Sequence, residues 1–164
     1  MKALFYTREF PPYVYGGAGV HVEYLATELA KLMEVDVRSF GDQDERSGNL
    51  TVKGFPFDNP VFENSDGKLK AVLKTLSTCI HMNADAIDAD IVHCHTWYSH
   101  FAGIIAKLCY GIPLVITTHS LEPLRPWKRE QLSRGYDASS WVEKTAIEMV
   151  LQVPSGYKRS NASR

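Results

Sequence analysis

The chain alternates short apolar runs with longer amphipathic stretches. Residues 3–6 form a short apolar run, which is typical of a buried strand. Apolar positions then recur at 22, 25, 26, 29, 32 and 33, a spacing that predicts one buried face of a helix. Residues 35–40 alternate apolar and polar side chains, so they predict a second strand, ending at Gly41.

The same alternation continues to residue 149. Residues 42–65 are polar and predict a loop that holds one strand, residues 50–55. Helical stripes follow at 69–80, 101–108 and 138–149, and strands are predicted at 90–95 and 114–118. Ser65 or Asp66 is the expected N-cap of the first of these helices, and Gly111 followed by Pro113 is a stop signal for the second.

Strands that alternate with helices define the fold class as α/β, with a parallel sheet and helices on both faces. In such sheets ligands bind beyond the carboxyl ends of the strands. Three segments occupy such positions: the loop after Tyr6, the residues around His95 and the residues around His119. We therefore expect the functional residues to lie in these segments.

Composition narrows the class of protein. The 164 residues suit one domain, and 45% hydrophobic with 23% charged residues exclude wholesale disorder. A net charge of -1 argues against a nucleic-acid or membrane partner, and no apolar run approaches the ~20 residues of a membrane span. Three widely spaced cysteines, Cys79, Cys94 and Cys109, predict reduced thiols in a cytoplasmic protein.

The loop before the first helix contains Gly16, Gly17 and Gly19. Glycines let the backbone approach a phosphate closely, and a helix N-terminus offers free N–H groups and partial positive charge. The loop lacks the GxGxxG pattern and a Walker lysine, so a tight turn that serves only packing stays an alternative.

Histidines and aromatic residues follow the strand at 90–95. His95 lies at its end, where it can contact a ligand, whereas His93 is expected to be a hydrogen-bonded core residue. These two histidines share a face, but no third ligand is evident, so no metal is expected. Trp97 offers a sugar a stacking surface. We expect His100, in the next helix, to be a surface or capping residue.

His119 follows the strand at 114–118 and can hydrogen-bond a hydroxyl group or stabilise a developing charge. Beyond it, Arg125, Lys128 and Arg129 form a basic turn. This turn is either a binding site for a phosphorylated or acidic partner, or a solvated surface.

Three segments resemble one enzyme family, the actinobacterial-type glycogen synthases and α-maltose-1-phosphate synthases of glycosyltransferase family 4. They are residues 9–22 (EFPPYVYGGAGVHV), 92–98 (VHCHTWY) and 118–132 (THSLEPLRPWKREQL). The likeness extends from residue 2 to about Met149. It implies a GT-B fold, two facing Rossmann-like domains, of which this chain resembles the N-terminal, acceptor-side domain.

The resemblance also implies roles for particular residues. His119 matches a catalytic histidine that contacts the transferred glucose, and Gly16 and Gly17 match residues that approach the donor diphosphate. The candidates for sugar, acceptor or phosphate contacts are His95, Trp97, Glu9, Tyr15 and Arg125. The implied reaction is transfer of glucose from ADP-glucose, with retention, to an α-glucan or to glucose 1-phosphate, without a cofactor or metal.

The chain departs from the family in two places. Related starch synthases carry a lysine where this chain has Tyr15, which removes one diphosphate contact. After Met149 the family continues into a buried strand, whereas residues 150–164 form a basic polar tail that we interpret as a truncation or frame-shift product. We therefore expect residues 1–149 to be an incomplete acceptor-side domain that lacks its last sheet elements.

The C-terminal, donor-binding domain is missing, so we expect this chain to be inactive alone and to self-associate through an open sheet edge. A stand-alone carbohydrate- or phosphate-binding module stays an alternative. A Rossmann dehydrogenase is disfavoured, because Ser39 and Phe40 stand where an acidic, ribose-binding residue is expected.

Overall fold

The computed structural model describes residues 1–150, and for Leu132 its backbone only. Within the described residues, six strands form one sheet: β1 (Lys2–Thr7), β2 (Glu34–Phe40), β3 (Asp44–Ser47), β4 (Leu50–Phe55), β5 (Ile91–His95) and β6 (Leu114–Thr117). The α-helices are α1 (Gly17–Ala30), α2 (Gly67–His81), α3 (Trp97–Tyr110), α4 (Lys128–Leu132) and α5 (Arg134–Val150). Two short 3-10 turns lie at η1 (Pro60–Phe62) and η2 (Glu122–Leu124).

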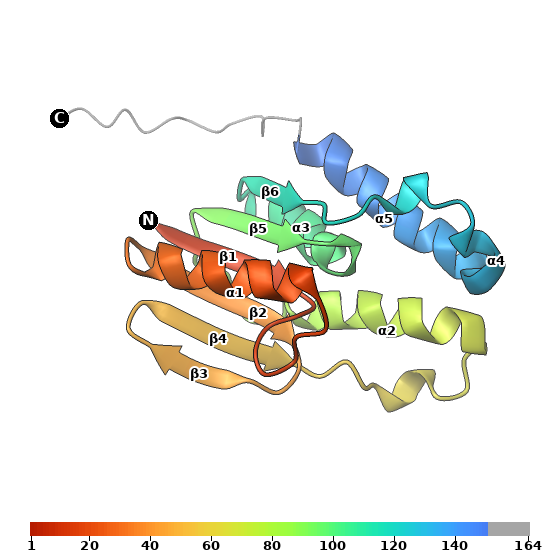
Figure 1. The fold of residues 1–164 in the computed structure, drawn as a ribbon, viewed down its shortest axis with the longest axis horizontal. Helices are drawn as coiled ribbons and strands as arrows, with labels where there is room; N and C mark the ends of the chain where they lie inside the picture. The colour runs from red at the N-terminus through yellow and green to blue at the C-terminus, as the bar shows by residue number, and fades with distance from the viewer. Residues whose placement is uncertain (151–164) are drawn as a thin grey trace.

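The strand order is β3-β4-β2-β1-β5-β6, and all neighbouring pairs are parallel except β3 with β4 (Figure 1). The predicted α/β class and mostly parallel sheet are confirmed. β6 is an edge strand within residues 1–150.

Each face of the sheet carries its own hydrophobic core. On one face Phe5, Val35 and Val37 pack against Val22 and Ala26 of α1. On the other face the core includes Leu4 and Cys94 of the sheet with residues of α2 and α3, while α5 packs on α3 beside β6 (Figure 1). Helices therefore cover both faces, as predicted from the alternation of strands and helices.

Capping residues explain why α2 begins, and why α3 ends, where the sequence indicates. The Asp66 carboxylate accepts a hydrogen bond from the backbone N–H of Lys68 (2.8 Å), which identifies Asp66 as the N-cap of α2. Gly111 ends α3 in the left-handed conformation, with φ 69°, which glycine adopts without steric cost.

The structure corrects the prediction of a loop at residues 42–49, since residues 44–47 form β3. All four β3 residues are exposed, so no hydrophobic alternation marks this strand. It pairs antiparallel with β4 through the backbone, across a turn at Gly48 and Asn49. A glycine–asparagine pair is a recognised hairpin signal, and it was the one available sign of this strand.

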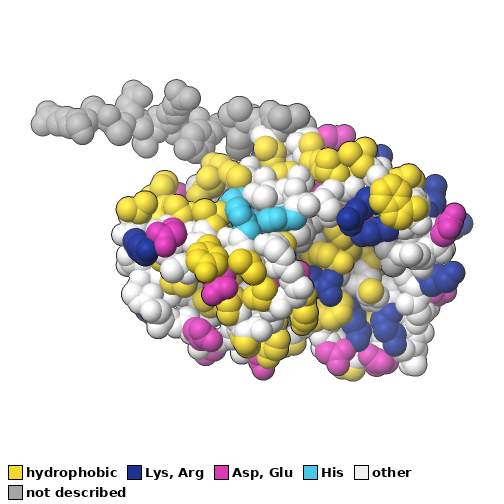
Figure 2. Space-filling view, viewed as in Figure 1, with side chains coloured by type: hydrophobic (Ala, Val, Ile, Leu, Met, Phe, Trp, Pro, Cys, Tyr) yellow, Lys and Arg dark blue, Asp and Glu magenta, His cyan; other side chains and the backbone are white. Residues whose placement is uncertain are grey.

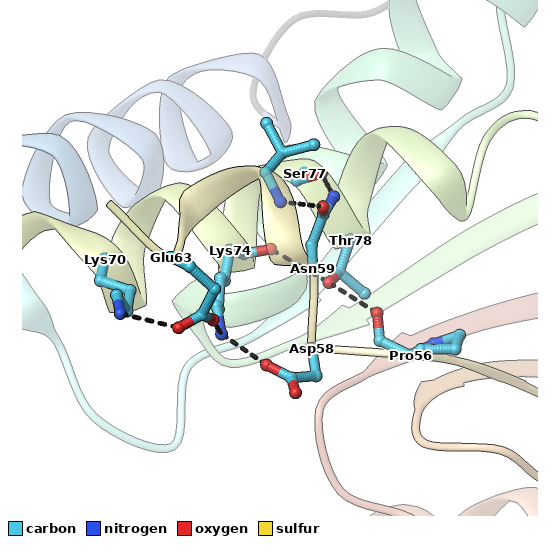
Figure 3. A network of polar contacts seen from close by, with 9 residues as sticks. Pro56, Asp58, Asn59, Glu63, Lys70, Lys74, Ser77 and Thr78 are labelled. Atoms are coloured by element: carbon cyan, nitrogen blue, oxygen red, sulfur yellow. Dashed lines mark hydrogen bonds and ion pairs between the residues drawn. The ribbon is translucent and has the colours of Figure 1, made fainter. Parts of the chain in front are cut away.

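A polar network fixes the loop between β4 and α2 (Figure 3). The buried amine of Lys74 contacts the carboxylates of Asp58 (2.5 Å) and Glu63 (3.1 Å). The two carboxylates raise the pKa of Lys74, and the amine lowers theirs. Asn59 also donates a hydrogen bond to the Ser77 hydroxyl (3.2 Å), so the loop is held along one side of α2.

The domain prediction spans residues 1–149 and the divergent tail 150–164. Val150 is the last residue of α5. The remainder of the predicted tail lies outside the described residues.

Candidate active site

The candidate site lies where three neighbouring parallel strands end. β1, β5 and β6 have the same direction, so the residues that follow them meet at one edge of the sheet. The α1 N-terminus, which follows β1, lies at the same edge (Figure 1). The sequence-predicted segments around Gly16, His95 and His119 are therefore brought together.

The glycines at the start of α1 leave its N-terminus open. A Cβ atom built on Gly16 or Gly17 would meet no atom within 4 Å, so neither glycine is required by packing within the described chain. Gly19 differs, because a Cβ there would lie 2.9 Å from the Glu9 side chain. The first helical N–H groups have no partner within the helix, and Gly16 supplies no side-chain cap. This geometry suits an anionic group.

Glu9 organises the glycine turn. Its Oε2 accepts hydrogen bonds from the backbone N–H groups of Tyr15 (3.0 Å) and Gly16 (2.9 Å). Its carboxylate therefore holds the turn that precedes α1. The proposed contact of Glu9 with an acceptor stays a prediction.

Three histidines from three segments form a cluster. One potential ligand atom each of His21, His95 and His119 lies within 4.8 Å of the others. His95 Nδ1 and His119 Nε2 are 3.4 Å apart. Within the cluster His95 is completely buried, whereas His21 and His119 are exposed. His119 therefore faces solvent and contacts the buried His95 ring on its inner side.

Burial favours the neutral form of His93, His95 and His119. Desolvation, reinforced by the neighbouring histidines, lowers the pKa of His95 to about 2 and that of His93 to about 4. The same causes lower the pKa of His119. His93 is half-buried, and its Nε2 forms a hydrogen bond of 2.8 Å with the Thr117 hydroxyl, in agreement with the core role predicted for it.

A cavity of about 290 Å³ lies at the start of α3, which follows β5, and its charged lining residues are basic. Trp97 and Tyr98 line it, together with Arg8 and Lys68. The Arg8 guanidinium stacks 4.1 Å from the centre of the Tyr98 ring. Figure 2 shows the histidines at the centre of this face, with lysine and arginine side chains and hydrophobic surface to one side.

Two of the predicted residues lie apart from the histidine cluster. Tyr15 is 75% exposed and lines a second, smaller cavity, which shares Arg8 with the first. Arg125 and Lys128 pair with the carboxylate of Glu122, at 3.7 and 2.7 Å. Two of the three basic residues of this turn therefore form ion pairs with the buried Glu122.

Sequence reasoning did not predict a buried polar cluster of His100, Glu122 and Glu143, which lies beneath the segment that carries His119. Glu143 Oε2 accepts a hydrogen bond from the backbone N–H of Glu122 (2.5 Å), and both glutamates are buried. His100 Nδ1 lies 3.9 Å from Glu143 Oε1. The expectation that His100 is a surface or capping residue is wrong, because its side chain is completely buried between α3 and α5. A polar residue on the predicted apolar face of a helix was the available signal.

The fold and the position of the site define the class of protein. The structure resembles that of sucrose-phosphate synthase from Thermosynechococcus elongatus, with a TM-score of 0.62 and 15% identity over 90% of this chain and 40% of that chain. The chain therefore has the fold of one Rossmann-like half of a GT-B enzyme.

The family follows from sequence comparison: the chain belongs to Glycosyltransferase Family 4, whose family model matches residues 15–152. It is 46% identical over 164 residues to the alpha-maltose-1-phosphate synthase of Mycolicibacterium smegmatis, covering 96% of this chain and 39% of the relative. The Mycobacterium tuberculosis (H37Rv) protein of the same name is 47% identical over 147 residues, with 90% and 35% covered. The glycogen synthase of that strain is 26% identical over 172 residues, with 92% and 42% covered.

These relatives are longer than this chain, which spans about two-fifths of the length of the first of them. The chain therefore belongs to a glycosyltransferase family, as the resemblance of its motifs implied. No helix within residues 1–150 is both long enough and apolar enough to cross a lipid bilayer.

Proposed function

We propose that this chain is the acceptor-side domain of a retaining glucosyltransferase that transfers glucose from ADP-glucose to glucose 1-phosphate. The observation that carries the choice of acceptor is the basic, aromatic cavity at the start of α3, lined by Trp97, Tyr98, Arg8 and Lys68. Its volume of about 290 Å³ is near the lower end of ligand cavities, about 300–1,000 Å³, and suits one phosphorylated sugar better than a long glucan.

The charges of the cavity support a phosphorylated ligand. The side chains of Arg8 and Lys68 form no ion pair or hydrogen bond within residues 1–150, so both cations are available to a ligand. Trp97 and Tyr98 provide flat surfaces of the kind that pack against sugar rings. In this proposal the cations hold the acceptor phosphate, and the aromatic rings hold its glucose.

The donor is assigned to the neighbouring helix terminus. The open N–H groups after Gly16 and Gly17 face an anion such as the diphosphate, and His119 hydrogen-bonds the transferred glucose and stabilises its developing positive charge. Burial lowers the pKa of His119, which favours the neutral imidazole for this task. The chain's own residues thereby bind both substrates on one side of the reacting carbon, and no cofactor is invoked.

Titration of the 164-residue chain with glucose 1-phosphate, followed by calorimetry or NMR, tests the acceptor. We expect Arg8→Gln and Lys68→Gln each to weaken binding by about tenfold, as expected for loss of one hydrogen bond to a charged group. Lys31→Gln is the matched control, because Lys31 is exposed at the far end of α1. Binding of maltooligosaccharides with no binding of glucose 1-phosphate would overturn the choice of acceptor.

The glycine turn is tested separately with ADP-glucose. Gly17→Ala is expected to weaken ADP-glucose binding by at least about tenfold while leaving the melting temperature unchanged, because its methyl group enters space that is open in the protein. Gly19→Ala is the contrasting variant, since its methyl group would press on Glu9 and lower the stability of the fold. Equal donor affinity in Gly17→Ala and the unmodified chain would contradict the assignment.

A binding module without catalysis is the second candidate, and the same cavity favours it. We propose that the 164-residue chain by itself does not turn over ADP-glucose, because stabilisation of the leaving group is usually the largest catalytic contribution and the glycine turn offers the diphosphate backbone N–H groups alone. Release of ADP from ADP-glucose and glucose 1-phosphate measures this. Turnover by the chain alone would contradict the proposal, and substrate binding without turnover is the expected result.

A further inference from the structure

The histidine cluster has the composition of a transition-metal site. His21 comes from the second turn of α1, His95 from the end of β5, and His119 from the segment after β6. One nitrogen from each lies within 4.8 Å of the others. The two nitrogens of His95 and His119 that face each other are 3.4 Å apart.

The deepest member of the cluster is His95, which is completely buried. Its Nδ1 faces His119, whereas its other ring nitrogen, Nε2, has no hydrogen-bond partner within the described residues. In the tautomer protonated at Nε2, Nδ1 carries the lone pair that a metal ion at the cluster needs. The low pKa of His95 and the lowered pKa of His119 leave both rings neutral, which is the form that binds metals.

The spacing is close to that of a three-histidine metal centre. Zn–N bonds of about 2.0–2.1 Å in a tetrahedron place the ligand nitrogens roughly 3.3 Å apart. His95 and His119 already have this separation. His21 and His119 are exposed and can therefore rotate by the small amount needed to complete the site. Three imidazoles without a carboxylate favour Zn²⁺, Ni²⁺, Co²⁺ or Cu²⁺ over Mg²⁺ or Ca²⁺.

We propose that His21, His95 and His119 form a binding site for a divalent transition-metal ion of the zinc class, with a fourth position open to solvent. Metal binding itself does not depend on the proposed function. One consequence does rest on it: an ion held by His119 occupies the imidazole assigned to the transferred glucose, so metal and ADP-glucose compete for this site.

Calorimetric titration of the 164-residue chain with ZnCl₂, and cobalt absorption spectra, test the site directly. Two changes remove other ligands: Cys109→Ser, because Cys109 is an exposed thiol, and His81→Gln, because His81 is an exposed histidine at the end of α2. In this background we expect one Zn²⁺ per chain, a tetrahedral Co²⁺ spectrum and no binding of MgCl₂. Residues 151–164 contain no His, Cys, Asp or Glu, so they add no side chain of these types.

The decisive variants are His21→Gln and His119→Gln in the same background. Both side chains are exposed, so the fold is expected to survive, which circular dichroism and melting in EDTA check. Each variant is expected to weaken Zn²⁺ binding by at least about tenfold and to abolish the rise in melting temperature that Zn²⁺ gives the parent chain. Unchanged zinc affinity in both variants, or loss of all binding in the Cys109→Ser, His81→Gln background, would overturn the site.

The two proposals fail in different ways. Zinc binding without glucose 1-phosphate or ADP-glucose binding would refute the proposed function and leave the metal site standing. Glucose 1-phosphate binding that is unaffected by His21→Gln, together with no zinc binding, would refute the metal site alone.

Discussion

Glu143 supports the loop that carries His119, and it does so from a position with no access to solvent. Its carboxylate accepts the backbone N–H of Glu122, three residues after His119. Burial, with a contribution from the charge of Glu122, raises the pKa of Glu143 from 4.5 to about 7. The folded chain therefore retains a proton there that the unfolded chain loses near pH 4.5.

This difference predicts a pH dependence with a definite sign. Between pH 4.5 and about 7 the folded state binds one more proton than the unfolded state at Glu143, so the stability from this group falls as pH rises, by at most about 1.4 kcal/mol per pH unit. Glu143→Gln mimics the protonated carboxyl group. We expect this variant to gain stability relative to the unmodified chain as pH rises from 5 to 7.

Urea unfolding across this pH range measures the effect as a difference between the two chains. Burial lowers the pKa of His100, which lies 3.9 Å from Glu143, to about 3, so the stability from His100 changes in the opposite direction and is lost as pH falls below 6.5. Glu148→Gln, an exposed change on the same helix, is the matched control and is expected to show no such gain. Parallel stability curves for Glu143→Gln and the unmodified chain would refute the raised pKa.

The sequence predicted some residues of the candidate site and not others. The strand-end rule located His95 and His119, and the glycines located the N-terminus of α1. It missed His21, although this residue is one helical turn after Gly17 and therefore lies near the same helix end. Arg8 and Lys68 could not be paired from sequence, because 59 residues separate two side chains that only the fold places on one cavity.

At the scale of elements, α3 lies very close to the sheet at Gly103. A Cβ atom there would meet Cys94 Sγ of β5 at 2.4 Å and Leu114 Cδ1 of β6 at 2.7 Å. Alanine normally stabilises a helix relative to glycine by about 1 kcal/mol. Here the close approach of helix and sheet reverses that preference.

We therefore expect Gly103→Ala to lower the free energy of unfolding by about 1–3 kcal/mol, which is the usual cost of overpacking a core. Gly67→Ala is the control, because a Cβ at Gly67, the first residue of α2, meets no atom within 4 Å. Chemical unfolding followed by circular dichroism gives both values. A Gly103→Ala chain as stable as Gly67→Ala would show that α3 can move away from the sheet at no cost.

The elements that the sequence predicted share one property: one side of each is buried. Apolar periodicity identified α2, residue type marked Ser65 or Asp66 as its N-cap, and the apolar run of β6 was plain from sequence. β3 has four exposed residues and is held by backbone pairing with β4, so periodicity gave no signal there. The sequence predicted a basic turn where the short helix α4 is found, because α4 depends on packing against α5.

At the scale of the whole molecule, the sheet ends at an exposed strand. Within residues 1–150, β6 pairs with β5 along one side and with no strand along the other. Val115 in this strand is 37% exposed. An apolar edge strand is a template for pairing with another chain.

We expect the 164-residue chain to self-associate in a concentration-dependent way, and Val115→Lys to reduce that association, because an inserted charge opposes pairing at an edge. Sedimentation velocity over a hundredfold range of concentration measures it. Leu32→Lys removes a more exposed apolar side chain from the end of α1, away from β6, and should leave association unchanged. A monomer at every concentration, or equal effects of the two variants, would contradict association through β6.

The sequence by itself determined the α/β class, the order of most strands and helices, and the family, because these depend on local periodicity and on contiguous motifs. Tertiary structure decided which residues share a site. The histidine cluster, the cavity of Arg8 and Lys68, and the buried pair of Glu122 and Glu143 each join segments that are distant along the chain. The physical reason is the same throughout: periodicity reports which side of an element is buried, whereas chemistry depends on distances that only the packed sheet and helices fix.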